Sequence, residues 1–370
     1  MSAMPTRQPI YDRDATELIG LDNDGQFEPG TEPAQKPKKR DKKKIILISV
    51  LIPLILLGVG FIAGGLYLRS VEGNVARVDA FAAIPEAGRP QKDAAAGGAI
   101  NFLLLGSDTR DPESLGGSRS DTIIVLHLNK DQTAAQLISI PRDTWTFIPK
   151  SANGKHGGVD SKINAAYAWG GVPLMVQTVE KYTGVRLDHV ALVDFAGFKD
   201  IVDALGGVNV NVESTFTSTH SLNPGGKRNF VKGPQVLDGP AALDYARERY
   251  SFKDGDFARI RHQQDVIKAI LDKASSGGTL SSPTRINSFL KATTDTVSVD
   301  KDLNLLGMAT QLRHLRSGNL KFFTSPSKGT GRIGTQSVVL PDPAKAKALF
   351  TAVRTDDTAK IEELGASSKK

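Results

Sequence analysis

Tyr245–Gln264 reads Y-A-R-E-R-Y-S-F-K-D-G-D-F-A-R-I-R-H-Q-Q and gathers many charges in one segment. Asp256, Arg259 and Gln263 are spaced i, i+3, i+7, so they would share one face of a helix. An adjoining stripe within Phe257–Leu271 is mostly apolar. The segment therefore predicts a helix with one face packed in the protein and one charged face.

The arginines of this segment indicate an anion site. Four of them fall within fifteen residues: Arg247, Arg249, Arg259 and Arg261. A guanidinium holds phosphate oxygens through two parallel hydrogen bonds, which a lysine cannot do. On this segment alone, a solvated basic face with internal Arg–Asp pairs is an equally good interpretation.

Three apolar, strand-like runs upstream each have an Asp or an Arg at one edge: Phe102–Arg110, Ser118–Leu126 and Ile138–Asp143. Asp108 follows the first strand and Asp121 begins the second. If these strands are neighbours, both carboxylates converge at one edge of the sheet, and two hard oxygen ligands suit Mg²⁺. An isolated aspartate more often caps a turn or a helix, so the residues alone leave both interpretations open.

In this order, the four segments resemble the motifs of the LytR–CpsA–Psr family of cell-wall glycopolymer ligases. The resemblance covers roughly Asn101–Leu271 and is specific because four separated motifs agree in order and spacing. It implies a phosphotransferase that joins a polyprenyl-pyrophosphate-linked glycopolymer to a peptidoglycan hydroxyl through a phosphodiester and releases polyprenyl phosphate. The same site would allow a pyrophosphatase side activity on the lipid.

The resemblance also implies site residues. Asp108 and Asp121 match the metal positions, which implies Mg²⁺ (or Mn²⁺). The positions around the lipid-linked pyrophosphate are matched by Arg119, Arg142, Lys162, Arg247, Arg249, Arg259 and Gln263. The expected catalytic set is Arg142, Asp143, Arg247, Arg249 and Arg259. Asp143 or a metal-side aspartate is the expected base, and the sequence does not decide between them. Gln177 and Glu180 are weaker candidates.

The arginine variants and the polyprenyl chain complete these expectations. We expect substitution of Arg247, Arg249 or Arg259 by alanine to weaken pyrophosphate binding and to leave the fold intact. His262 departs from the family, which tends to have a second arginine there, and the adjacent Arg261 is the residue that would compensate. Three apolar segments would line the family's polyprenyl tunnel or form ordinary core: Ala165–Trp169, Val172–Val179 and Phe195–Leu205.

Topology follows from Ile45–Leu68, which holds no charged residue and is long enough to cross a bilayer. Seven of the nine residues before it, 36–44, are Lys or Arg, whereas only Arg69 follows closely. The positive-inside rule then gives a single-pass protein of the cell membrane with a cytoplasmic N-terminus and an extracellular catalytic domain. A cleaved signal peptide would have a shorter apolar core and a shorter basic leader.

The remaining chain alternates strands and helices, which predicts an α/β fold, an α-β-α sandwich around a mixed central sheet. The expected divisions are a disordered cytoplasmic tail (1–44), a transmembrane helix (45–68), a linker (69–98), the catalytic domain (99–355) and a polar tail (356–370).

Composition limits the rival functions. The net charge of +7 suits anionic lipid, anionic polymer or nucleic acid, but the predicted topology places the arginines outside the cell and argues against nucleic acid. The absence of cysteine excludes thiol nucleophiles and thiolate metal sites. Two alternatives stay open: a non-catalytic carrier of polyprenyl pyrophosphate, and, with less support, a transcriptional regulator. The identity of the glycopolymer and the oligomeric state are not predicted.

Overall fold

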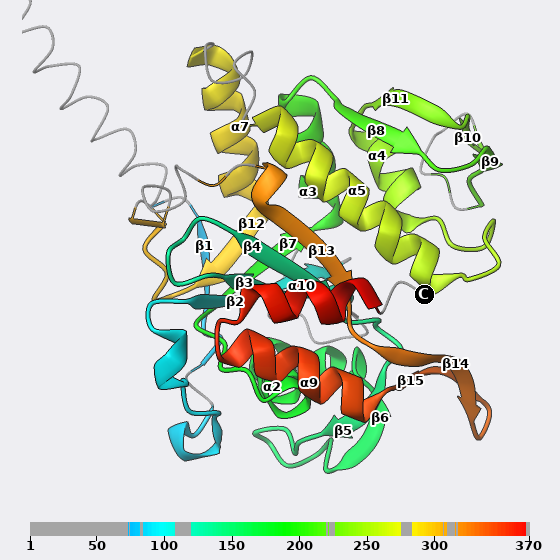
Figure 1. Ribbon diagram of the computed structural model, residues 1–370. Helices are drawn as coiled ribbons and strands as arrows, with labels where there is room; N and C mark the ends of the chain where they lie inside the picture. The colour runs from blue at the N-terminus through cyan, green and yellow to red at the C-terminus, as the bar shows by residue number, and fades with distance from the viewer. Residues whose placement is uncertain are drawn as a thin grey trace, which may run out of the picture. The chain divides into compact units, whose positions relative to one another are not determined.

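The computed structural model describes residues 73, 75–81, 84–107, 120–219, 221, 226–274, 283–305, 307–308, 315 and 317–367 (Figure 1). The predicted cytoplasmic tail and transmembrane helix lie outside these ranges. Within them, no helix is both long and apolar enough to span a bilayer.

A seven-stranded mixed sheet organises the described residues. Its strand order is β1-β12-β7-β2-β3-β4-β13. The strands are β1 (Ala76–Val78), β12 (Val297–Asp300), β7 (His189–Asp194), β2 (Ile100–Ser107), β3 (Ser120–Leu128), β4 (Ala135–Ser139) and β13 (Leu320–Thr324). β2 pairs antiparallel with β3 and parallel with β7, so the predicted mixed sheet is confirmed.

Helices cover both faces of this sheet, as the near-continuous apolar runs of the strands predict. On β2, Leu103 and Leu105 pack in the cluster that contains residues of α2 (Ala165–Thr183) and α9 (Pro343–Arg354). Leu104, which points to the opposite face, packs in a cluster with Ile267 of α5 (Asp256–Ala274). In Figure 1, α2 and α9 lie on one side of the sheet and α5 on the other.

The remaining elements frame the site. The helices are α3 (Phe195–Ala204), α4 (Gly239–Arg247), α7 (Pro283–Thr296) and α10 (Thr358–Ser367). Within the described ranges there are also four two-stranded ribbons. They pair β5 (Trp145–Ile148) with β6 (Val159–Lys162), β8 (Val208–Val212) with β11 (Gly233–Leu237), β9 (Phe216–Thr217) with β10 (Asn229–Phe230), and β14 (Ser327–Ile333) with β15 (Gln336–Pro341).

Local sequence explains where the helices begin and break. Asp238 precedes α4 and accepts a hydrogen bond from the Ala241 backbone N–H at 2.8 Å, and Pro240 occupies the first turn, where its missing N–H costs nothing. α2 is broken at Gly170 and Gly171, and Gly171 has a φ of +62° that favours glycine. α2 therefore consists of two helical segments that meet at these glycines.

Two segments are more ordered than the sequence predicted. Residues 76–78, assigned to a linker, form β1, and Arg77 donates hydrogen bonds from Nη1 to the carbonyl oxygens of Asp300 (3.0 Å) and Leu303 (2.6 Å). Residues 358–367, assigned to a polar tail, form α10, in which Ile361 is fully buried and Gly365 lies against the Phe323 ring. Both segments therefore belong to the folded unit.

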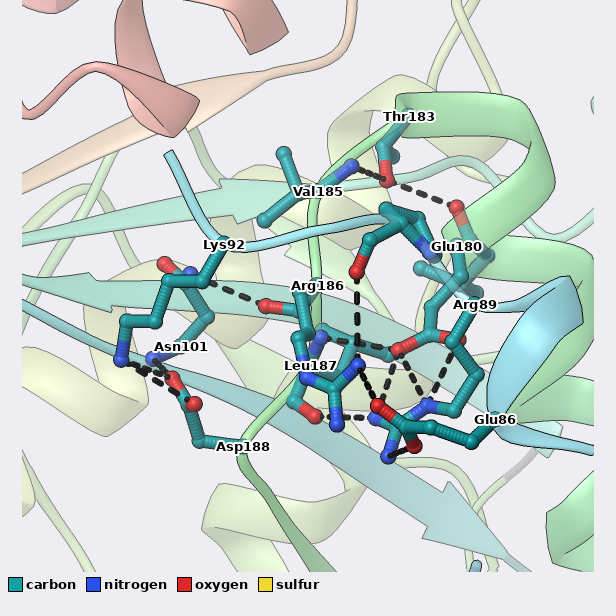
Figure 2. A network of polar contacts seen from close by, with 12 residues as sticks. Glu86, Arg89, Lys92, Asn101, Glu180, Thr183, Val185, Arg186, Leu187 and Asp188 are labelled. Carbon is teal, nitrogen blue, oxygen red and sulfur yellow. Dashed lines mark hydrogen bonds and ion pairs between the residues drawn. The ribbon is translucent and has the colours of Figure 1, made fainter. Parts of the chain in front are cut away.

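A buried ion pair fixes the N-terminal segment to the end of α2 (Figure 2). Arg89 Nη2 lies 2.7 Å from Glu180 Oε1 and also donates to the Leu187 carbonyl, and the side chains of Arg89 and Glu180 are only 8% and 3% exposed. The Leu187 N–H donates to the same Glu180 oxygen at 3.0 Å. Outer pairs join Arg186 to Glu86 and Lys92 to Asp188. Glu180 thus has a structural role and lines neither of the cavities described below.

Candidate active site

Two cavities lie along α5. A polar cavity of about 690 Å³ adjoins its first residues and includes Asp256 and Phe257 in its lining. An apolar cavity of about 270 Å³ adjoins its later turns and includes Gln263, Ile267 and Ile270. At 1.5 Å rise per residue, Asp256 and Gln263 are separated by about 10 Å along the helix axis. The first turn of α5 therefore borders the polar cavity, and its later turns border the apolar cavity.

A row of alternating charges leads from the polar cavity to the buried side chain of Arg259. Lys162 Nζ lies 3.2 Å from Asp143 Oδ1, and Asp143 Oδ2 lies 4.0 Å from Arg142 Nε. Arg142 Nε lies 3.9 Å from Asp256 Oδ1, which in turn lies 2.5 Å from Arg259 Nη2. This row of charges connects the loop between β4 and β5, the end of β6 and the first turn of α5. The structure therefore brings together four of the predicted residues, Arg142, Asp143, Lys162 and Arg259, through Asp256.

Asp256 and Arg259 form the buried end of this row of charges. Their side chains are 9% and 5% exposed, and neither Asp256 oxygen accepts a hydrogen bond. Burial raises the pKa of the Asp256 carboxyl, and the charges of Arg259, Arg142 and Arg249 oppose that rise. Arg259 was predicted as a direct pyrophosphate ligand. In the structure its guanidinium neutralises the buried carboxylate of Asp256 and lines neither cavity.

Arg249 is positioned by its neighbour Glu248, which sequence reasoning missed. The Glu248 carboxylate is buried and accepts hydrogen bonds from the backbone N–H groups of Arg249 (2.9 Å), Tyr250 (2.8 Å) and Ser251 (3.1 Å). Burial raises the pKa of Glu248, but the hydrogen bonds from Thr219, Ser251 and Tyr250 bring the net pKa below its usual value. The hydrogen bonds to Glu248 fix the loop from which Arg249 and the exposed Tyr250 line the polar cavity.

The apolar cavity lies between the sheet and helices α3, α4 and α5. Its lining includes Leu104, Phe198, Ile201 and Leu243, with Arg247 and Gln263 among the few polar members. Phe198 and Ile201 belong to the predicted tunnel segment Phe195–Leu205. The other two segments proposed for the tunnel lie on α2, whose side chains pack in the main core and line neither cavity, so the ordinary-core interpretation holds for them.

Three predicted residues cannot be placed by their side chains. Arg119 and Asp108 lie outside the described residues, and only the backbone of Asp121 is described. β2 and β3 are antiparallel neighbours, and Ser107 at the end of β2 pairs with Ser120 at the start of β3. Among the described residues no group of three or more His, Asp or Glu side chains forms a metal site.

His262 is a packing residue. It is fully buried, and its ring lies 4.2 Å from Tyr245, 4.8 Å from Phe252 and 5.7 Å from Phe216, measured between centroids. Burial lowers its pKa. The adjacent Arg261 pairs with Glu213 and Asp254 and lines neither cavity, so the structure does not support the predicted compensation by Arg261.

Comparisons with known proteins found a family, curated relatives and solved structures that resemble this chain. The model of the LytR_cpsA_psr family matches residues 74–355. The chain is 37% identical over 251 residues to the polyisoprenyl-teichoic acid–peptidoglycan teichoic acid transferase TagU of Bacillus cereus, covering 65% of this chain and 75% of the relative. It is 31% identical to the cell wall biosynthesis protein LcpA of Corynebacterium glutamicum, covering 83% of this chain and 64% of the relative. The crystal structure of B. subtilis TagV matches with a TM-score of 0.58 at 27% identity, covering 71% of this chain and 97% of that one.

Proposed function

The chain belongs to the LytR-CpsA-Psr family, and from this premise we propose that it is a phosphotransferase of the cell wall. The donor is a glycopolymer on polyprenyl pyrophosphate, and the acceptor is a hydroxyl of peptidoglycan. The observation that carries the proposal is that an apolar cavity and a cavity lined by charged residues follow one another along the same helix, α5. A polyprenyl pyrophosphate likewise consists of an apolar chain followed by a charged pyrophosphate.

The donor fits with its chain in the apolar cavity and its pyrophosphate at the arginines. Arg247 and Gln263 border the apolar cavity, and Arg142, Arg249 and Lys162 line the polar one. A pyrophosphate is multiply charged, so several cationic donors are needed to neutralise it. Arg119 is proposed as a further member of this group on its sequence position alone.

The reaction is a displacement at the phosphorus that carries the sugar. The acceptor oxygen forms a bond to this phosphorus, and the bond to the bridging oxygen breaks, so polyprenyl phosphate leaves. Arginines that face the leaving phosphate stabilise the charge that develops there in the transition state. The hydroxyl proton needs an acceptor, and Asp143 is the proposed base because it lines the polar cavity and is held by Lys162 at 3.2 Å.

Asp108 and Asp121 are proposed to hold Mg²⁺ or Mn²⁺. The proposal rests on their sequence positions, each one residue beyond a serine of the neighbouring strands β2 and β3, and on the preference of these ions for carboxylate oxygen. When bound, the cation supplies additional neutralisation of phosphate charge. We further propose that residues 45–68 anchor the chain in the cell membrane as a single span and that the folded unit lies outside the cell.

Transfer by the purified full-length protein tests the proposal. The protein in detergent micelles is incubated with a lipid-linked glycopolymer and soluble peptidoglycan fragments, and mass spectrometry follows the joined product. We expect product with the wild type and at least about a hundredfold less with Arg247→Ala or Arg249→Ala. Retention of the lipid with no product would favour a carrier of polyprenyl pyrophosphate instead.

A further inference from the structure

The β14–β15 hairpin forms a wall of the polar cavity that the mechanism has not used. At its base the Val339 N–H donates to the Asp143 carbonyl oxygen at 2.8 Å, and Thr144 forms a bridge with Val339. Val338 and Val339 are buried, whereas the rest of the hairpin extends away from the sheet (Figure 1). The hairpin is thus fixed at its base to the segment that carries the proposed base.

A bulge directs β14 at the point where it borders the cavity. Ser327 pairs with Pro341 and Thr330 pairs with Val339, so two residues between them have a single partner opposite. One of these two, Gly329, has a φ of +93°, which side-chain-bearing residues rarely adopt. Gly329 and Thr330 both line the polar cavity. Bulges occur preferentially next to active sites, where they change the direction of a strand.

The hairpin carries positive charge and no negative charge. Its residues, 327–341, include Lys328 and Arg332 and neither Asp nor Glu. Both cations are exposed. Arg332 follows the cavity-lining Thr330 by two residues and shares its face of the strand, and Lys328 directly precedes the cavity-lining Gly329 in the bulge. Among the described residues, neither cation has an acidic partner within ion-pair distance. The charge of this surface is therefore available to an anionic partner.

The direction of the reaction identifies which substrate reaches this wall. The attacking and leaving oxygens lie roughly in line across the phosphorus. If the leaving polyprenyl phosphate occupies the apolar cavity, the incoming hydroxyl approaches through the polar cavity, which the hairpin borders. The acceptor is a glycan whose short peptides carry carboxylates. These negative charges complement the positive charges of Lys328 and Arg332 on the hairpin beside the polar cavity.

We propose that the β14–β15 hairpin is the acceptor-binding element, in which Lys328 and Arg332 pair with carboxylates of the peptidoglycan peptides. This inference rests on the proposed function. The pairing is solvent-exposed, so each cation contributes modestly, about threefold in affinity, and the two together about tenfold. The hairpin would set the affinity for the acceptor and leave donor binding unchanged.

The test compares full-length wild type with K328E/R332E in the transfer assay. Two acceptors are used: a peptidoglycan fragment with its peptides, and the same glycan after enzymatic removal of the peptides. K321E/K347E reverses two exposed lysines on β13 and α9 and serves as the control of equal charge. We expect K328E/R332E to raise KM for the peptide-bearing acceptor about tenfold, with kcat, donor KM and the peptide-free reaction unchanged.

Three results would overturn the proposal. An equal rise in KM for the peptide-free glycan would show that the hairpin does not bind the peptide carboxylates. A rise in donor KM would show that the hairpin binds the donor polymer. An equal rise in acceptor KM in K321E/K347E would show that the effect depends only on the net charge of the protein. If the wild type makes no product, the proposed function fails, and calorimetric binding of the peptide-bearing fragment then decides on the hairpin separately. K328E/R332E should still weaken that binding about tenfold, and equal binding would refute the inference.

Discussion

Substitution of Arg259 by alanine should cost both stability and activity, contrary to the expectation from sequence that the fold stays intact. The guanidinium lies 2.5 Å from Asp256, and both side chains are less than one-tenth exposed. Removal of one partner of a buried pair typically costs about 3–5 kcal/mol because the other charge stays buried. Arg142 remains 3.9 Å from Asp256, so we expect a loss near the lower end, about 3 kcal/mol.

Urea unfolding of the full-length protein, followed by tryptophan fluorescence and circular dichroism, measures this loss. The matched variant is Arg259→Ala/Asp256→Ala, which removes both charges and should recover about 2 kcal/mol of the free energy of unfolding. Both variants should lose transfer activity by about a hundredfold, because the guanidinium proposed to bind the pyrophosphate is missing in each. Wild-type stability and wild-type transfer in Arg259→Ala would refute the assignment.

The pH dependence of this loss follows from Asp256. Burial raises its pKa in the folded protein above the value in the unfolded chain, so the folded state holds the proton more tightly. Its contribution to stability is therefore greatest below the unfolded pKa and declines as the pH rises through the folded pKa. Removal of Arg259 raises the folded pKa further. The deficit of Arg259→Ala should be largest at neutral pH and should shrink towards pH 4, and a deficit that grows on acidification would contradict this sign.

Four further predictions address the other parts of the account. Glu180→Ala leaves Arg89 buried without its carboxylate and should lower the free energy of unfolding by about 3–5 kcal/mol in urea titrations, whereas a loss below about 0.5 kcal/mol would be inconsistent with the network of Figure 2. Ala246→Phe places a ring in the apolar cavity and should weaken binding of a fluorescent polyprenyl pyrophosphate about tenfold; unchanged affinity would exclude this cavity as the lipid site. Asp108→Ala, Asp121→Ala and EDTA should each reduce transfer about a hundredfold with lipid binding retained within about tenfold, and full activity in chelator would rule out the metal role. A C-terminal alkaline phosphatase fusion should be active in cells and lose activity when residues 45–68 are deleted; activity of a cytoplasmic reporter would reverse the topology.

The features that sequence predicted well are those set by local periodicity. The apolar runs of β2 and β3 identified strands covered on both faces, and the i, i+3, i+7 spacing correctly placed Asp256 and Arg259 together on α5. Gln264, which follows the predicted site residue Gln263, has a different role. Gln264 donates to Ser139 Oγ and to the Phe323 carbonyl, so it fixes α5 to the sheet and does not enter either cavity.

The features that sequence missed depend on partners far along the chain. β1 is a three-residue strand, A-R-V, whose identity comes from its pairing with β12 more than two hundred residues later. Glu248 reads as a surface acid among arginines, but its role depends on Thr219 and on the loop that it caps. The β14–β15 hairpin is rich in glycine and polar residues, and only the contact of Val339 with Asp143 reveals that it borders the site. None of these relations leaves a periodic signal in the sequence.

The most direct test of the central claim is the fate of a labelled phosphate. A donor is prepared with ³²P only in the phosphate next to the sugar, and the full-length protein transfers it to peptidoglycan fragments. The proposed displacement predicts that the label enters the peptidoglycan product and that one unlabelled polyprenyl phosphate is released for each product formed. Label that remains on the lipid as polyprenyl pyrophosphate, beside a joined product without ³²P, would show glycosyl transfer and contradict the account.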